Sequence, residues 1–333
     1  MSVSPAISVL VPAWNAAAFI HTAIASLKQQ TLANFEALIV DDASTDNTAA
    51  AIDEAVAGDP RFKLIRLDQN GGSSAARNAG LAVARGAWIA VLDADDAIAP
   101  ERLARLKQAA ERSDLDIVCD NPMICADIAK PEAGKPMLPM ALDAPPRPVD
   151  LARFVRANCP SKGQGALGYL KPMFRASFLR DHAIRYPKAQ PIAEDYTFFA
   201  DALAYGARAA IVPYRDYFYW VREGSISRKP ISKDFALMLQ ADDDFRSRHA
   251  SRLSKPEIAA LDARRRELVD MHTYQRFVEG IRTGNGHQTA EILRRPLAIR
   301  FLKNTFDHHT AKVLAILLAI LFGDHGLARR ARR

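Results

Sequence analysis

Short apolar runs alternate with amphipathic stretches over the first 120 residues. Runs typical of buried strands cover residues 7–11, 37–40, 63–67 and 88–92. Apolar residues recur at helical spacing over residues 19–29, 47–57, 74–84 and 101–112. This alternation predicts an α/β fold with a mainly parallel central sheet that is covered by helices on both faces. Such sheets bind ligands beyond the C-terminal ends of their strands.

The remaining two thirds of the chain show three further patterns. Seven of the 19 prolines fall within residues 121–150, which predicts a long surface excursion without regular structure. Further on, the predicted helices and strands cover residues 151–157, 195–205, 209–212 and 216–221. Beyond residue 229 the pattern is helical, over residues 234–248, 256–281, 288–293 and 310–322. We therefore predict an α/β domain over residues 1–228 and a helical C-terminal region over residues 229–333.

Composition and charge limit the class of protein. Of 333 residues, 49% are hydrophobic and 25% are charged, which excludes a disordered or low-complexity chain. The three cysteines form no C-x-x-C pair, so neither a disulfide scaffold nor a zinc ribbon is expected. The net charge of +7 is confined to residues 229–333, which carry 20 Lys and Arg against 12 Asp and Glu. This distribution favours an anionic surface such as a membrane over nucleic acid as a partner.

Three acids follow the predicted strand at residues 88–92. Asp93, Asp95 and Asp96 are crowded at a strand end, where carboxylates repel one another unless cations or donor groups lie among them. A divalent metal that also binds a diphosphate is one solution, because hard cations prefer oxygen ligands. The alternative is that the acids cap the helix that begins near Pro100.

Two more polar clusters follow neighbouring strands. In the Asp41–Asp46 segment, Asp42 is a candidate to bind a base or ribose, whereas Asp46 is either functional or the cap of the next helix. The Asn70–Gly80 segment opens a helix with small residues and carries Arg77. Backbone donors and one arginine suit a nucleotide phosphate, although a solvated arginine after a glycine loop is the alternative.

The motifs together resemble a known family. Ile7–Asn15, Val40–Asp46, Ala76–Gly80 and Asp93–Asp96, in this order, are similar to the family 2 glycosyltransferases of the GT-A fold. The resemblance continues more loosely through Gly168–Phe174 and Ala193–Tyr196, and it is greatest to bacterial enzymes that build exopolysaccharides of the succinoglycan type.

The resemblance implies roles for individual residues. Donor-nucleotide binding is implied for Pro12, Asn15, Asp42, Arg77 and Asp93. Asp95 would be the direct ligand of Mn²⁺ or Mg²⁺, with Asp93 beside it. The catalytic base would come from the Glu194-Asp195 pair, principally Asp195, and the product would be inverted at the anomeric carbon. From the residues alone, an acid pair favoured at a helix N-terminus is the better explanation, and the resemblance reverses this for Asp195.

Two segments near the end of the first domain bear on the same site. Arg222, within Trp220–Ser227, either supplies positive charge to the leaving group or lies at a solvated strand end. Gly163–Gly168 matches the dinucleotide pattern G-x-G-x-x-G but follows no strand and opens no helix, so we predict a turn near the acceptor. The Q-x-x-R-W motif of the processive members is absent, which favours one sugar per encounter.

The C-terminal region contains a candidate membrane-docking helix. Residues 313–322 are ten consecutive apolar residues, too few to span a bilayer, and four arginines end the chain. A helix over residues 310–322 either docks on an anionic inner leaflet or packs against the catalytic domain. The first residues show no signal peptide, so we expect a cytosolic enzyme on the inner face of the plasma membrane.

The leading hypothesis is an inverting, metal-dependent glycosyltransferase. Its donor would be a nucleotide sugar, most simply a UDP-sugar, and its acceptor a glycan or lipid-linked saccharide in cell-surface polysaccharide synthesis. A nucleotidyltransferase would need a basic, Gly-rich signature after the first strand, and Pro12–Asn15 contains none. A catalytically silent nucleotide- or glycan-binding protein is the third hypothesis.

Overall fold

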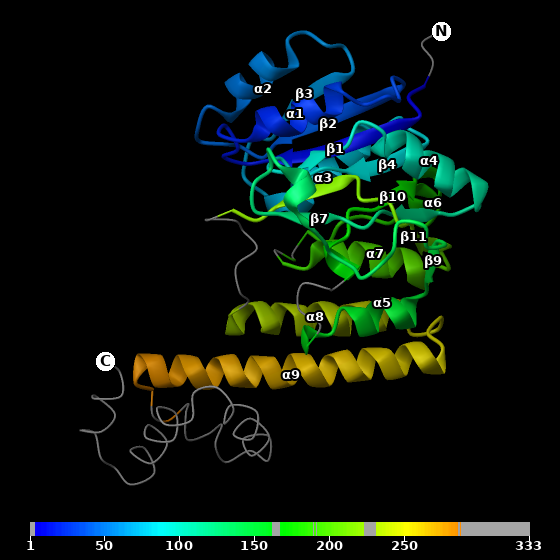
Figure 1. Cartoon of the computed structure of the whole chain (residues 1–333). Helices are drawn as coiled ribbons and strands as arrows, with labels where there is room; N and C mark the ends of the chain where they lie inside the picture. Colours follow the sequence, from blue (N-terminus) through cyan, green and yellow to red (C-terminus); the bar gives the residue numbers. More distant parts are fainter. Residues whose placement is uncertain are drawn as a thin grey trace. The chain divides into compact units, whose positions relative to one another are not determined.

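Figure 1 shows the computed structural model of the chain, which describes residues 4–161, 167–188, 190, 192–222, 231–285 and 287. The chain divides into two compact units. The first comprises Met1–Arg228 and Gln240–Arg264, and the second comprises Lys229–Leu239 and Arg265–Arg333. The helices predicted at residues 288–293 and 310–322 lie outside the described residues, as does most of the Gly163–Gly168 turn.

The strands are short, as expected for an α/β protein. Their bounds are β1 Ile7–Ala13, β2 Phe35–Asp41, β3 Phe62–Arg66, β4 Trp88–Val91, β5 Ala97–Ile98, β6 Ile117–Cys119, β7 Met123–Cys125, β8 Lys135–Pro136, β9 Arg147–Val149, β10 Met173–Arg175, β11 Ala209–Ile211 and β12 Tyr217–Trp220.

The helices follow in the order that the periodicity predicts, and the described residues contain α6 and the 3₁₀ turns η1 and η3 in addition. Their bounds are α1 Ile20–Lys28, α2 Thr48–Val56, α3 Gly72–Val83, α4 Arg102–Arg112, η1 Pro131–Ala133, α5 Leu151–Ala157, η3 Leu167–Tyr169, α6 Ala176–Asp181, α7 Glu194–Ala204, α8 Ser232–His249 and α9 Lys255–Thr283.

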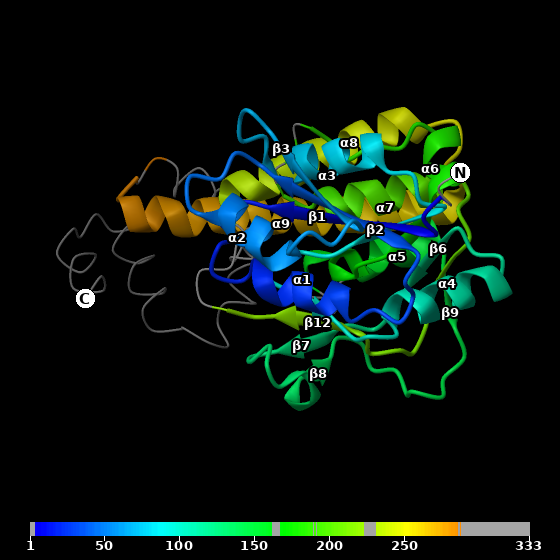
Figure 2. The same ribbon diagram turned by 90° about the horizontal axis from the view of Figure 1, so that it is seen from above.

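In the described residues, the central sheet has the strand order β3-β2-β1-β4-β10-β6-β11-β9. Strands β3, β2, β1 and β4 are parallel, so their C-terminal ends lie at one edge. β10 enters antiparallel between β4 and β6. A smaller sheet has the order β5-β12-β7-β8, and Figure 2 shows β12, β7 and β8 side by side. The predicted α/β fold is confirmed.

The core lies on both faces of the central sheet because side chains of successive strand residues point to opposite faces. On β1, Val9 and Val11 pack with α1, α2 and α4, whereas Leu10 packs with α5 and α7. The strands therefore read as continuous apolar runs, as expected for a sheet buried on both faces.

The prediction of a structureless excursion at residues 121–150 is wrong. This segment contains β7, β8 and β9, and its Leu138 and Met140 are buried. Proline is tolerated at a sheet edge, where a ladder hydrogen bond is not needed. Pro136 ends β8 and Pro148 lies in β9, each an edge strand of its sheet.

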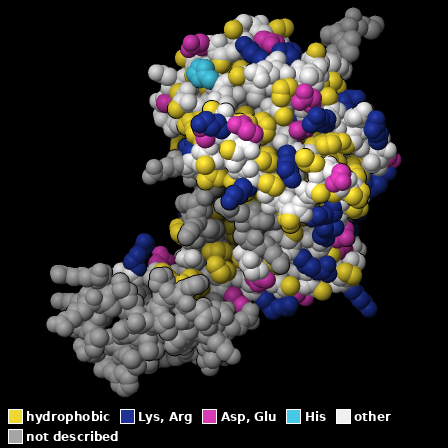
Figure 3. All heavy atoms as spheres, viewed as in Figure 1, with side chains coloured by type: hydrophobic (Ala, Val, Ile, Leu, Met, Phe, Trp, Pro, Cys, Tyr) yellow, Lys and Arg dark blue, Asp and Glu magenta, His cyan; other side chains and the backbone are white. Residues whose placement is uncertain are grey.

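Both signs of charge occur together on the face seen in Figure 3, where Lys and Arg side chains lie among Asp and Glu. The three cysteines are buried. No helix in the described part of the chain has the length and apolar character needed to span a bilayer.

Glu36 in β2 carries a buried charge at the opposite end of the strand from the polar clusters. Its carboxylate accepts hydrogen bonds from Ser8 Oγ (2.8 Å), Lys63 Nζ (3.0 Å) and the Arg85 backbone N–H (2.8 Å). Burial by itself raises the pKa of Glu36, but the hydrogen bonds from Arg85, Lys63 and Ser8 outweigh it and lower the pKa to about 2.

The variant Glu36→Gln is expected to lower the free energy of unfolding at pH 7 by about 3 kcal/mol, the equivalent of this pKa shift. Because the folded-state pKa is depressed, the stabilisation is present above the ordinary pKa of 4.5 and is lost as pH falls toward 2. Urea unfolding at pH 7 and at pH 3 measures it, with Glu54→Gln on the exposed face of α2 as control. An equal effect at both pH values would contradict the prediction.

Candidate active site

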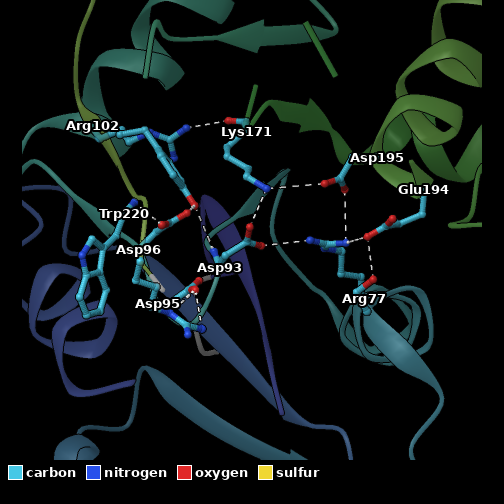
Figure 4. Close-up of polar contacts among 12 residues, drawn as sticks. Arg77, Asp93, Asp95, Asp96, Arg102, Lys171, Glu194, Asp195 and Trp220 are labelled. Atoms are coloured by element: carbon cyan, nitrogen blue, oxygen red, sulfur yellow. Dashed lines mark hydrogen bonds and ion pairs between the residues drawn. The ribbon is translucent and has the colours of Figure 1, made fainter. Parts of the chain in front are cut away.

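Most of the predicted site residues lie at the C-terminal ends of β1, β2 and β4, in α3 and at the first turn of α7, and Arg222 follows β12. Figure 4 shows the central part of this arrangement, where Asp93 lies between Arg77 and Lys171, and Asp195 lies beyond them. The site is built around acids that are paired with buried cations.

Asp93 directly follows the buried end of β4. Its Oδ1 accepts a hydrogen bond from Arg77 at 3.0 Å, and its Oδ2 accepts one from Lys171 Nζ at 2.6 Å. Burial raises the pKa of Asp93, but the charges of Lys171 and Arg77 outweigh burial and hold the pKa well below its usual range. Asp93 is therefore ionised in the folded protein.

Arg77 in α3 is a shared cation at the centre of the site. Its side chain is 4% exposed and lies 2.7 Å from Glu194 and 3.3 Å from Asp195 in addition to Asp93. The guanidinium also lies over the ring of Tyr186, 5.3 Å from its centroid. Arg77, to which the resemblance assigns donor binding, is thus paired with three acids: Asp93, Glu194 and Asp195.

Lys171 is a site residue that sequence reasoning missed. Its side chain is 7% exposed, and its Nζ lies 3.6 Å from Asp195 Oδ2 as well as 2.6 Å from Asp93. With Arg77 it closes a ring of alternating charges, in which each cation contacts both Asp93 and Asp195. A lysine inside an apolar run, between Leu170 and Pro172, was the available signal, because a buried ammonium needs acidic partners.

Glu194 and Asp195 begin α7 but differ in what their carboxylates do. Glu194 accepts hydrogen bonds from Ser73 Oγ at 2.6 Å and from Arg77 at 2.7 Å, which tie α7 to α3. Asp195 lies at the longer ion-pair distances given above, and its side chain is 25% exposed. Burial raises the pKa of Asp195, while Arg77 and Lys171 oppose the increase. Asp195 thus makes longer contacts than Glu194 and keeps part of its carboxylate exposed.

Asp95 pairs with Arg222, so two predicted site residues meet directly. Arg222 Nε and Nη2 lie 3.0 and 2.9 Å from Asp95 Oδ2, and the guanidinium lies over the ring of Phe19 at 4.1 Å. Burial and the charge of Asp93 raise the pKa of Asp95, against the effect of Arg222. A further cation near Asp95 would relieve this unfavourable burial.

Asp96 has a different environment from the other two acids of its motif. It accepts hydrogen bonds from Tyr217 Oη at 2.6 Å and from the Trp220 backbone N–H at 2.9 Å. Burial, together with the charges of Asp93 and Asp95, raises the pKa of Asp96 to about 8. These contacts attach β12 to the loop after β4 and so bring Arg222, two residues beyond Trp220, to Asp95.

The remaining predicted residues form the edge of the site beyond β1 and β2. Pro12 lies in β1, and Asn15, which has φ of 49°, accepts a hydrogen bond from the Thr45 backbone N–H at 2.9 Å. Asp42 accepts hydrogen bonds from the N–H groups of Gly71 and Gly72 at 2.9 and 2.7 Å, and so shapes the loop before α3.

Asp46 caps α2, as one of its two interpretations proposed. Its Oδ1 accepts a hydrogen bond from the Thr48 backbone N–H at 3.0 Å. The structure thus brings Arg77, Asp93, Glu194 and Asp195 into one network and joins Asp95 to Arg222. Asp42 and Asn15 contact the neighbouring loops instead.

The donor set fits a divalent metal held in part by a substrate. Across the described ranges no group of three or more His, Cys, Asp or Glu side chains is arranged to hold a metal ion. Mg²⁺-type sites commonly use one or two carboxylates together with phosphate oxygens. The contacts of Arg222 in the described part of the chain are to Oδ2 of Asp95, whereas both oxygens of Asp93 accept from cations of the chain. Asp95 therefore fits a metal better than Asp93.

Known proteins with similar sequences identify the family. The profile of glycosyl transferase family 2 matches residues 8–148. The succinoglycan biosynthesis protein ExoO of Rhizobium meliloti (strain 1021) is 38% identical over 251 residues, 74% of this chain and 69% of that protein. The succinoglycan biosynthesis protein ExoU of the same strain is 33% identical over 297 residues, 88% of this chain and 84% of that protein. The predicted resemblance to exopolysaccharide enzymes is confirmed.

Solved structures with the same architecture include two glycosyltransferases. TarS 1–349 of S. aureus in complex with UDP-GlcNAc has a TM-score of 0.63 and 21% identity, covering 98% of this chain and 90% of that one. The mannosyltransferase PcManGT of Pyrobaculum calidifontis in complex with GDP-Man and Mn²⁺ has a TM-score of 0.57 and 18% identity, covering 99% and 87%. At such identities the likeness shows the fold, which is the predicted GT-A fold. The profile match and the two succinoglycan relatives show that this chain belongs to glycosyltransferase family 2.

Proposed function

We propose that the protein is an inverting, metal-dependent glycosyltransferase that moves a sugar from a nucleotide-sugar donor to a glycan or lipid-linked acceptor. The observation that carries the proposal is the ring of charges in which Arg77 and Lys171 each contact both Asp93 and Asp195. In this ring the partly exposed carboxylate of Asp195 lies close to the cations that also pair with Asp93. Family membership sets the nucleotidyltransferase hypothesis aside.

The names of the similar proteins support a role in exopolysaccharide synthesis and a UDP-sugar donor. Both relatives from Rhizobium meliloti are named for succinoglycan biosynthesis, and TarS was solved with UDP-GlcNAc. PcManGT was solved with GDP-Man and Mn²⁺, which supports a divalent metal and leaves the base of the nucleotide to experiment. In this proposal the enzyme works in the cytosol, on an acceptor at the inner face of the plasma membrane.

In the proposed mechanism, Asp195 accepts the proton of the acceptor hydroxyl as its oxygen attacks the anomeric carbon. The new carbon–oxygen bond forms on the face opposite the breaking bond to the diphosphate, so the configuration inverts. Asp95 would hold a divalent cation, which would supply positive charge to the leaving diphosphate. Arg222, 2.9 Å from Asp95, is the side chain of this protein that is placed to add a second positive charge there.

Nucleotide binding tests the metal assignment. Titration with UDP, GDP, dTDP and CMP is expected to show one nucleotide that binds at least 10-fold more tightly with Mn²⁺ than without it. In Asp95→Asn this gain is expected to disappear, because both oxygens of Asp93 accept from cations of the chain and those of Asp96 accept from Tyr217 and Trp220. Calorimetry measures both, and Asp53→Asn, on the exposed side of α2, is the matched control.

Two outcomes would count against the proposal. The proposed metal site at Asp95 would be contradicted if every nucleotide bound independently of metal. It would also be contradicted if Mn²⁺ still tightened nucleotide binding in Asp95→Asn. Tight metal-dependent binding without transfer from any nucleotide sugar would favour the catalytically silent binding protein.

A further inference from the structure

The residue that follows Asp195 is held by an aromatic and cationic cluster outside the charge ring. The ring of Tyr196 in α7 stacks on Phe154 of α5, with centroids 5.4 Å apart and planes inclined by 10°. The guanidinium of Arg264 in α9 lies 4.0 Å from the centroid of the same ring. All three residues are buried, and Arg264 is 4% exposed. We call Phe154, Tyr196 and Arg264 the Tyr196 clamp.

The polar groups of Arg264 reach two further elements. Its Nε donates to both carboxylate oxygens of Asp242 in α8, at 3.0 and 3.3 Å. Its Nη1 donates to the backbone carbonyl of Asn158, just beyond α5. A guanidinium is suited to this task because its planar face stacks on a ring while its edge donates several hydrogen bonds.

Asn158, which accepts a hydrogen bond from Arg264, also contacts the segment that precedes Lys171. Its Oδ1 accepts a hydrogen bond from the backbone N–H of Gly168 at 2.6 Å. The contact is close, because a Cβ at Gly168 would lie 2.8 Å from that oxygen and 3.5 Å from Cβ of Tyr196. The 3₁₀ turn η3 therefore packs against the start of α7. Gly168 in this turn lies three residues before Lys171 in the sequence.

Asp195 is thus constrained from two sides by one arginine. Tyr196, its neighbour in the chain, contacts Arg264 directly, and Lys171, its ionic partner, follows a turn that Arg264 fixes through Asn158. A proton acceptor must be held closely, since a displacement of about 1 Å can lower a rate by roughly 10²-fold.

We infer that Arg264 is a positioning residue that orients Asp195 toward the acceptor, and that residues 240–264 of the helical region are part of the catalytic unit. The inference rests on the proposed function of Asp195. It goes beyond the family profile, which ends at residue 148. It assigns to α8 and α9 a part in catalysis that is distinct from any contact with a membrane.

The test is Arg264→Met, which keeps the length and apolar stem of the side chain and removes the guanidinium. The value of kcat is expected to fall about 10-fold to 100-fold, while KM for the donor and Kd for the nucleotide stay within about 2-fold. The reason for this split is that Asp93 and Asp95 make no contact with the Tyr196 clamp. Amide exchange at the first turn of α7 is expected to become faster.

Two variants of the same region serve as controls. Arg266→Met alters an exposed arginine of α9 and is expected to change neither kcat nor exchange. Tyr196→Phe keeps the stacked ring, and because no described residue forms a hydrogen bond with Tyr196 Oη, a much smaller loss of kcat than in Arg264→Met is expected. Tyr196→Leu removes the ring, and its effect on kcat is expected not to add to that of Arg264→Met.

Unchanged kcat and α7 exchange in a destabilised Arg264→Met would overturn the inference, and so would a raised KM with normal kcat. If Arg264→Met does not fold, Asp242→Asn tests the inference instead. This variant weakens the hydrogen bonds that hold the guanidinium but leaves the ring of Tyr196 stacked on Phe154. Faster amide exchange in α7 and a reduced kcat are then expected. Failure of the proposed function is separate, since it is seen as absence of transfer by the unaltered protein, in which case α7 exchange still tests the clamp.

Discussion

Replacing Asp195 with asparagine is expected to lower kcat for sugar transfer by about 10³-fold, within the range that general-base catalysis contributes. Asparagine keeps the size of the side chain but cannot accept the proton of the acceptor hydroxyl. Asp195 is suited to this role because it is partly exposed, unlike Arg77 and Lys171, and lies 3.3 and 3.6 Å from these cations. Release of the nucleoside diphosphate at saturating donor and acceptor measures kcat.

Glu194→Gln is the matched control, because it changes the neighbouring acid in the same turn. Glu194 is engaged with Ser73 and Arg77, so its loss is expected to loosen the contact between α3 and α7 and to lower kcat less than Asp195→Asn. Both variants should retain metal-dependent nucleotide binding. A larger loss in Glu194→Gln than in Asp195→Asn would reverse the assignment of the base.

The parallel half of the sheet was predictable from sequence because its signals are local. Each strand from β1 to β4 is a mainly apolar run, and the helix after it has its own periodicity. The strands β7, β8 and β9 were missed since they are two or three residues long and lie among prolines. The pairing of β7 with β12 and of β9 with β11 depends on residues 60 or more positions away, which no local pattern reveals.

The candidate site was predictable to the same extent. Acids that follow strands can be predicted as site residues, because the fold brings the ends of parallel strands to one edge of the sheet. The cations that pair with these acids cannot be predicted in this way. Lys171 is 78 positions from Asp93 in the sequence, and Arg222 is 127 positions from Asp95. Asp46 shows that the position of an acid within a motif does not by itself define its role, since its carboxylate accepts a hydrogen bond from the backbone at the start of α2.

Lys171→Met is expected to have the second largest effect, a fall in kcat of about 10²-fold, comparable to the loss of one preorganised electrostatic contact. The buried ammonium neutralises Asp93 and Asp195 together, so its removal leaves two acids that only Arg77 holds. Breaking a buried pair in this way also lowers the free energy of unfolding by about 3 kcal/mol.

The kinetic and structural parts of this effect are separable. Lys171→Arg keeps the charge and is expected to recover part of the lost stability, whereas the larger guanidinium shifts Asp195 and leaves kcat low. Lys107→Met, in a pair with Glu111 on the surface of α4, is the control and should change neither. Steady-state kinetics and urea unfolding on the same preparations give both quantities. A folded Lys171→Met with normal kcat would show that the charge ring serves stability alone, and that Asp195 acts without the cation that links it to Asp93.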